Sequence, residues 1–123
     1  MLVVTTDDIP GWEIQRLCGE VLGLTVRPTG ASGLKNMFGA NPERLLKNLS
    51  YSRQEAIGRM IEDARNRGGN AIVAMRFDTT ELCEGLTEIC AYGTAVQAVP
   101  VTEAAKSTAQ QLGYGLQPSA STL

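Results

Sequence analysis

The stretch NPERLLKNLSYSRQEAIGRMIEDARNRGG, residues 41–69, decides the fold because it predicts one long amphipathic helix. Asn41 is a favourable N-cap, and Pro42 suits the first helical position because its φ is already fixed near the helical value. Apolar side chains then recur at steps of three and four residues, which places them in one stripe along a helix. Glycine readily adopts the left-handed conformation that closes many helices, so Gly68-Gly69 marks the end.

A break in this helix at Ser50–Ser52 is the alternative, since Ser52 and Glu55 have the spacing of a capping box. The apolar stripe nevertheless keeps its phase across these residues. We therefore expect a single long helix.

Strands are predicted on both sides of the helix. Asn70–Leu82 alternates between two faces, and Thr87–Val99 is a second strand of similar length. Glu84-Gly85 between them forms a tight turn, so the two strands make a hairpin. Upstream of the helix, Leu2–Thr5 and Glu13–Val26 are strand-like as well.

The order strand, strand, long helix, strand, strand predicts an α+β fold with one helix on one face of an antiparallel sheet. Such a sheet leaves its second face or its strand edges uncovered. The sequence therefore predicts self-association, not a stable monomer.

Four glycines are expected to be structural. A glycine inside a strand usually marks a bulge or a close backbone approach, and this applies to Gly19, Gly23 and Gly93. Gly69 closes the helix and precedes the next strand. None of the four is expected to take part in chemistry.

Two segments lie outside these elements. The glycine-rich Pro28–Ala40 is predicted to be a loop. Thr102–Leu112 is predicted to be a short helix ended by Gly113, and the polar Gln117–Leu123 to be a flexible tail. We expect one domain over residues 1–100, followed by a C-terminal extension over 101–123.

The composition excludes several classes of function. Eleven Lys and Arg against thirteen Asp and Glu give a net charge of −2, so no positive field favours nucleic acid. The chain has no apolar run long enough for a membrane span and no export signal at its start, so we expect a cytoplasmic protein. Three cysteines in that compartment are expected to be free thiols.

Histidine is absent, which removes the commonest general base and a common metal ligand. A cysteine-dependent enzyme using Cys18 or Cys90 would have to take Glu or Lys as its base. We therefore expect a protein without enzymatic activity.

The hairpin carries the main concentration of potential metal ligands. If Glu84-Gly85 is the turn, Glu81 lies opposite Glu88, and like charges directly opposite are destabilising. A cation between them would relieve the repulsion. The alternative is that these acids are simply solvated at a hairpin tip. The six residues concerned are Asp78, Glu81, Cys83, Glu84, Glu88 and Cys90.

The thiols of Cys83 and Cys90 would lie on the same face as those acids, with Thr79 opposite Cys90. They would be on the order of 13 Å apart at the rise of a strand, so one chain does not bring both to one metal. Cys90 has the alternative of being a small buried apolar residue. Cys18, beside Gly19, is a second candidate, and its alternative is a bulge packed against a neighbouring subunit.

The chain contains several short motifs in a definite order. They are Gly11 with Ile14, Cys18-Gly19-Glu20-Val21-Leu22-Gly23, Arg53-Gln54-Glu55-Ala56, Ala64 with Gly69-Asn70-Ala71-Ile72-Val73, Phe77-Asp78, and Gly93-Thr94-Ala95-Val96. This order, over roughly residues 2–99, resembles the YbjQ-like family of bacteria and archaea, which is described as "putative heavy-metal-binding". The resemblance implies a dodecin-like β-β-α-β-β subunit that closes into a homopentameric ring, with function unestablished.

We therefore expect an oligomeric binding protein whose sites take a divalent or soft metal ion or another small ligand. The alternatives are a structural or partner-binding ring without a ligand and, ranked last, the cysteine-dependent enzyme. The candidate metal ligands are Glu81, Glu88, Cys83, Cys90 and Cys18.

Overall fold

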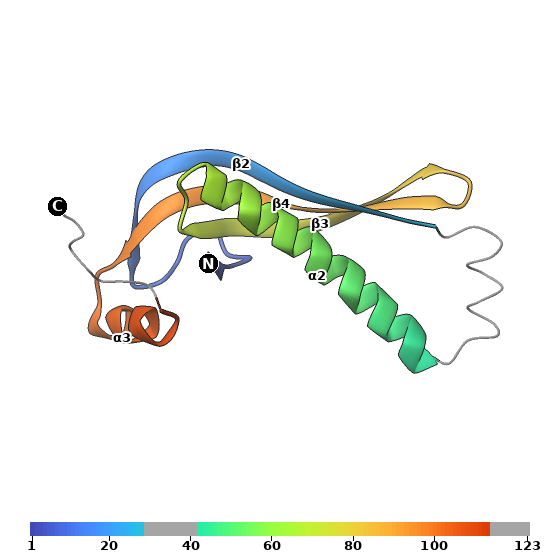
Figure 1. Cartoon of the computed structure of the whole chain (residues 1–123). Helices are drawn as coiled ribbons and strands as arrows, with labels where there is room; N and C mark the ends of the chain where they lie inside the picture. Colours follow the sequence, from blue (N-terminus) through green and yellow to red (C-terminus); the bar gives the residue numbers. More distant parts are fainter. Residues whose placement is uncertain (29–41, 114–123) are drawn as a thin grey trace.

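The computed structural model describes residues 1–28 and 42–113, which form one four-stranded sheet and two helices (Figure 1). The α+β class is confirmed, with two strands, a long helix and a hairpin in the expected order. The loop expected up to Ala40 and the tail expected from Gln117 lie outside the described residues. The elements are β1 (Leu2–Val3), β2 (Trp12–Pro28), α2 (Pro42–Asn66), β3 (Ala71–Cys83), β4 (Leu86–Pro100) and α3 (Glu103–Gln111).

The sheet has the strand order β1-β3-β4-β2. β4 pairs antiparallel with both β3 and β2, but β1 pairs parallel with β3, with Leu2 opposite Ala71. The expectation of a purely antiparallel sheet is therefore wrong at this edge. A strand of two residues carries no sequence signal for its direction. The direction is stabilised by bonds beyond the strand itself, such as the one from Val4 N to Ile72 O at 2.9 Å.

α2 runs unbroken from Pro42 to Asn66, so the alternative break at Ser50–Ser52 is wrong. α2 ends just before Gly68-Gly69, as the sequence predicts. Gly68 has a φ of +81°, a left-handed value that costs glycine little. The N–H of Gly69 then donates to the carbonyl oxygen of Ala64 at 2.9 Å. This turn leads the chain directly into β3.

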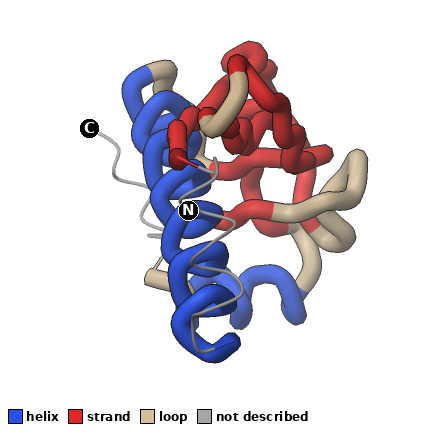
Figure 2. The backbone as a smooth tube through the Cα atoms, turned by 90° about the vertical axis from the view of Figure 1, so that its right-hand side faces the viewer, coloured by secondary structure: helices blue, strands red, loops and turns tan. Residues whose placement is uncertain are grey.

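α2 covers one face of the sheet and forms a second layer on it (Figures 1 and 2). Met60 of α2 is fully buried and belongs to the same core cluster as Val21 of β2 and Ala91 of β4. The helix comes close because Gly23 has no side chain: a Cβ there would lie 1.9 Å from the carbonyl oxygen of Ala56. Gly23 therefore sets how near α2 lies to β2.

The opposite face carries a second core cluster at one end only. Ile9, from the segment between β1 and β2, packs there with Val73 and Val96. α3 lies at the same end of the sheet and buries Ala105 and Ala109 (Figure 1). Toward the hairpin, this face has neither α3 nor the N-terminal segment over it.

The short C-terminal helix forms as predicted over Glu103–Gln111. Thr102 is its N-cap, and its side chain accepts a hydrogen bond from Ala105 N. The chain leaves the helix at Gly113 with a φ of +79°.

Glycines also lie where the strands are irregular or crowded. Gly19 has a φ of +104° at a register shift between β2 and β4. At Gly93 a Cβ would lie 2.8 Å from the side chain of Ile72, and at Gly69 it would lie 3.1 Å from that of Ala95. All three positions thus favour the absence of a side chain.

Candidate functional site

The hairpin turn between β3 and β4 lies where it was expected. Glu84-Gly85 forms the turn, Gly85 has a φ of +83°, and Cys83 pairs with Leu86. Up to this rung the sequence-based register is correct.

The facing pair of Glu81 and Glu88 does not form. A register shift next to Leu82 pairs Glu81 with Thr87 and Glu88 with Thr80. Opposite residues share a face and successive residues alternate, so the two glutamates lie on opposite faces of the sheet. The predicted cation site between them is therefore wrong for a single chain. One extra residue in β3 is enough to separate the two carboxylates.

The shift gives Cys90 different neighbours from those expected. Cys90 pairs with Asp78 of β3, not with Thr79, and with Leu24 of β2 on its other side. Glu88 stands two residues before Cys90 on the same face. This face is the one that α2 does not cover, because the adjacent Ile89 belongs to the core beneath α2.

The thiol of Cys90 stands in an acidic environment. Burial raises its pKa, and the negative charges of Glu88, Asp78 and Glu20 raise it further. The thiol is thus held in its neutral form at physiological pH. A cation bound beside it would offset the same carboxylates and favour the thiolate.

The other two thiols lie apart from Cys90. Cys18 is partly buried and packs against the core beneath α2, whereas Cys83 is exposed at the hairpin tip. All three are free thiols. Within residues 1–28 and 42–113, no group of three or more His, Cys, Asp or Glu is placed to hold a metal ion. The described part of one chain therefore supplies an incomplete ligand set.

Three apolar side chains of β2 form an exposed row beside Cys90, which we call the β2 row. Leu22, Leu24 and Val26 are 45%, 42% and 45% exposed. They are paired with Tyr92, Cys90 and Glu88 of β4. A contiguous exposed apolar patch of this kind is typical of an interaction surface.

The sequence contains a signal for this row in the pattern of residues along β2. In β2, Leu22, Leu24 and Val26 alternate with Gly23 and Thr25 and so share one face, while the apolar Val21 lies on the other face. A strand with apolar residues on both sides is typical of one that is covered on both faces. Among the described residues, the face of β2 toward α2 is covered, whereas Leu22, Leu24 and Val26 stay exposed on the other face.

The outer edge of β2 is bonded to α2 by two side chains. The N–H of Leu22 donates to Asp63 Oδ2 at 3.2 Å, and Arg59 donates to the carbonyl oxygen of Leu24. These bonds occupy backbone groups that an exposed edge strand would otherwise offer to another chain. The edge of β2 is therefore partly blocked at these two residues, whereas its outer face is not.

Residues 1–99 match the model of the YbjQ_1 family, described as "Putative heavy-metal-binding". The chain belongs to the YbjQ_1 family. Among its relatives, a UPF0145 protein of Streptomyces avermitilis is 50% identical over 104 residues, which cover 80% of this chain and 86% of that protein. Another from Burkholderia thailandensis is 45% identical over 103 residues, with coverage of 80% and 93%.

A solved structure resembles this YbjQ_1 member at the level of fold. It is a protein of unknown function of the DUF74 family from Pediococcus pentosaceus, with a TM-score of 0.54 and 16% identity. The match covers 79% of this chain and 96% of that one.

Neither helix among the described residues of this family member is both long and apolar enough to cross a membrane.

Proposed function

We propose that this protein is a homo-oligomer that binds a borderline metal ion such as Zn²⁺ through the thiolate of Cys90, without catalysing a reaction. The observation that carries the proposal is the position of Cys90 between Asp78 and the β2 row, on the uncovered face of the sheet. The description of the family as heavy-metal-binding supports the class of ligand.

The donor types suit such an ion. A thiolate with carboxylate oxygens is a ligand set that Zn²⁺ accepts, usually with four ligands in all. One chain supplies Cys90 with Asp78 paired opposite it on β3, and a second copy would add the remaining donors. Since Cys90 adjoins the β2 row, an interface on that row would bring two copies together beside the thiol. The resemblance described above gives five as the number of copies.

Two features favour binding over catalysis. The chain has no histidine to act as a general base. The raised pKa of the Cys90 thiol is the reverse of what an activated nucleophile needs.

The second candidate function is a structural ring without a ligand. It is favoured by the fact that the described residues hold no group of three metal-ligating side chains.

Protection of the thiols from alkylation tests the proposal, since a metal-bound thiolate reacts slowly. The full chain is treated with iodoacetamide with and without Zn²⁺, and the modification of each cysteine is followed by peptide mass spectrometry. We expect Zn²⁺ to protect Cys90 while Cys83 at the exposed tip keeps its rate. Asp78→Asn should raise the zinc concentration for half protection about tenfold or more, as expected for roughly 1.4 kcal/mol of lost binding free energy.

Glu81→Gln is the matched control, because it removes one negative charge near the same hairpin tip but on the opposite face. It should leave the protection of Cys90 unchanged. If Zn²⁺ fails to protect Cys90, or protects Cys83 and Cys90 alike, the metal site is wrong and the structural ring becomes the better account.

A further inference from the structure

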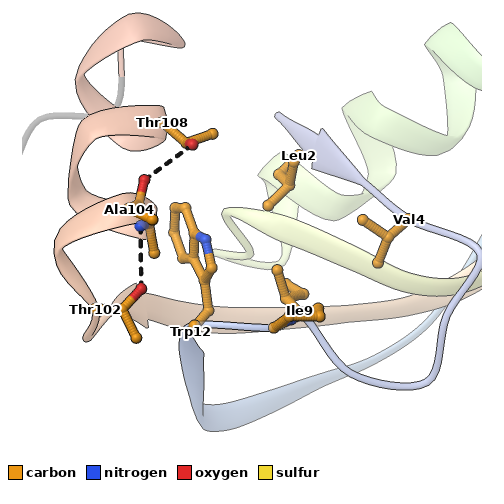
Figure 3. Close-up of a pocket in the computed structure, with 10 residues that line it drawn as sticks. Leu2, Val4, Ile9, Trp12, Thr102, Ala104 and Thr108 are labelled. Carbon is orange, nitrogen blue, oxygen red and sulfur yellow. Dashed lines mark hydrogen bonds between the residues drawn. The ribbon is translucent and has the colours of Figure 1, made fainter.

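A second concave site lies at the far end of the sheet, between α3 and the N-terminal segment (Figure 3). Its cavity of about 450 Å³ is within the range of small-molecule sites, roughly 300–1,000 Å³. It is separate from Cys90, which lies toward the hairpin. The lining residues are Leu2, Val4, Ile9, Pro10, Gly11, Trp12, Thr102, Ala104, Ala105 and Thr108.

Backbone bonds fix the wall that α3 contributes. The N–H groups of Val101 and Thr102 donate to the carbonyl oxygen of Gly11 at 2.8 and 3.3 Å. Thr102 also caps α3 by accepting a hydrogen bond from Ala105 N at 3.1 Å. A Cβ at Gly11 would lie 2.6 Å from Thr102 Oγ1, so glycine permits this junction. The site is thus pre-formed by the turn that starts α3.

The lining contains no charged side chain, so it offers nothing to offset the cost of removing an ion from water. Its two hydroxyl groups are already engaged. Thr102 caps the helix, and Thr108 donates to the carbonyl oxygen of Ala104 at 3.0 Å. The lining therefore offers a ligand few polar side chains.

The indole of Trp12 stands between α3 and Leu2 and dominates the site (Figure 3). A flat aromatic side chain packs well against the ring of a ligand, by offset stacking or edge-to-face contact. The buried Ile9 and Ala105 and the partly buried Leu2 complete an apolar surface around it. The indole and the absence of charge in the lining together favour a neutral molecule that contains a ring.

We propose that this cavity binds a neutral, predominantly apolar small molecule that contains an aromatic ring, which packs against Trp12. The family model ends at residue 99, before α3 begins. One wall of the site therefore comes from the part of the chain that lies beyond the family match. The site does not depend on metal binding at Cys90.

Trp12 is the only tryptophan in the chain, so its fluorescence reports on the cavity directly. The full chain is titrated with N-phenyl-1-naphthylamine, a neutral ring compound that accepts energy from tryptophan. The charged comparison is 1-anilinonaphthalene-8-sulfonate, which has the same ring system plus a sulfonate. We expect saturable quenching of Trp12 by the neutral probe and binding weaker by about tenfold or more for the sulfonate, because its charge is not offset.

Two variants that each introduce two leucines into α3 test the location. Ala104→Leu with Thr108→Leu fills the cavity and should weaken binding about tenfold or more. Ser107→Leu with Gln110→Leu adds the same residues at exposed positions of α3 outside the lining and should leave binding intact. Thr108→Leu alone is the milder filling variant if the double variant melts early. Equal binding by the filled and control variants would overturn the proposal.

Two other occupants give distinct results. If the probe binds only after residues 114–123 are removed, the occupant is the C-terminal segment of this chain. If probe binding falls as the protein concentration rises, the occupant is a second copy. Either result, like an absence of saturable quenching, would overturn the proposal. Binding by the full chain that is independent of protein concentration supports it.

Discussion

At the scale of single residues, Gly23 in β2 and Gly58 in α2 have opposite effects on stability. At Gly23 a Cβ would lie 1.9 Å from Ala56 O and 2.5 Å from Met60 N, both of which are backbone atoms of α2. At Gly58, in the middle of α2, an added Cβ would meet nothing within 4 Å. The first glycine is required by packing, whereas the second only adds flexibility to the unfolded chain.

Alanine at each position should therefore change stability in opposite directions. Gly23→Ala is expected to lower the free energy of unfolding by about 3 kcal/mol or more, since the helix backbone has to move away. Gly58→Ala should raise it by about 0.5–1 kcal/mol, because alanine is the better helix former. Urea unfolding followed by circular dichroism measures both. Equal effects of the two substitutions would show that α2 does not lie directly on Gly23.

At the scale of elements, the strong local signals were read correctly. Asn41-Pro42 and Gly68-Gly69 bracket a helix that the structure assigns to Pro42–Asn66, and Glu84-Gly85 makes the predicted turn. The register beyond the turn could not be predicted, because nothing in the sequence marks Leu82 as an extra residue. A slip of one residue moves a side chain to the other face, which is why the predicted pairing of Glu81 opposite Glu88 was wrong.

A second irregularity in β3 could not be predicted from the sequence either. Ala74 has a φ of +56°, a value that an alanine adopts only under strong constraint from its surroundings, and it lies within the register shift between Val73 and Arg76. Its N–H donates to the carbonyl oxygen of Thr6 at 2.8 Å. This contact joins residues far apart in the chain, so periodicity along β3 could not reveal it.

The hydrogen bond from Leu22 N to Asp63 joins α2 to the edge of β2. Asp63→Ala should cost about 1 kcal/mol for the lost hydrogen bond and leave the edge open to pairing with other chains. We expect more light scattering on heating than for the native protein. Glu62→Ala, which removes the same charge from the neighbouring position, should behave like the native protein. If the two variants scatter alike, the bond does not protect the edge.

At the scale of the whole molecule, the uncovered end of the sheet is the feature on which the proposed self-association rests. Among the described residues, α2 packs on one face of the sheet, and the other face is covered near Ile9 and α3. The β2 row and Cys90 occupy the remainder. Because Cys90 and the β2 row lie side by side on this face, we propose that the thiol and the row act together.

Charges placed in the β2 row should separate the copies. Leu22→Glu with Leu24→Glu would bury two carboxylates in the interface, which is strongly unfavourable. Light scattering is expected to give the mass of the 13.1 kDa monomer for this variant and a larger mass for the native protein. Leu82→Glu with Leu112→Glu is the control, because these leucines are 49% and 53% exposed away from the row. Dissociation of the control alone would place the interface elsewhere.

Native mass spectrometry of the zinc-treated full chain tests the central claim most directly, because it counts protein copies and metal ions in the same particle. The account predicts a closed assembly that carries zinc, and it predicts that Cys90→Ser keeps the assembly but loses the metal. Cys83→Ser should retain both. A zinc-free assembly or a monomer of the native protein would contradict the account.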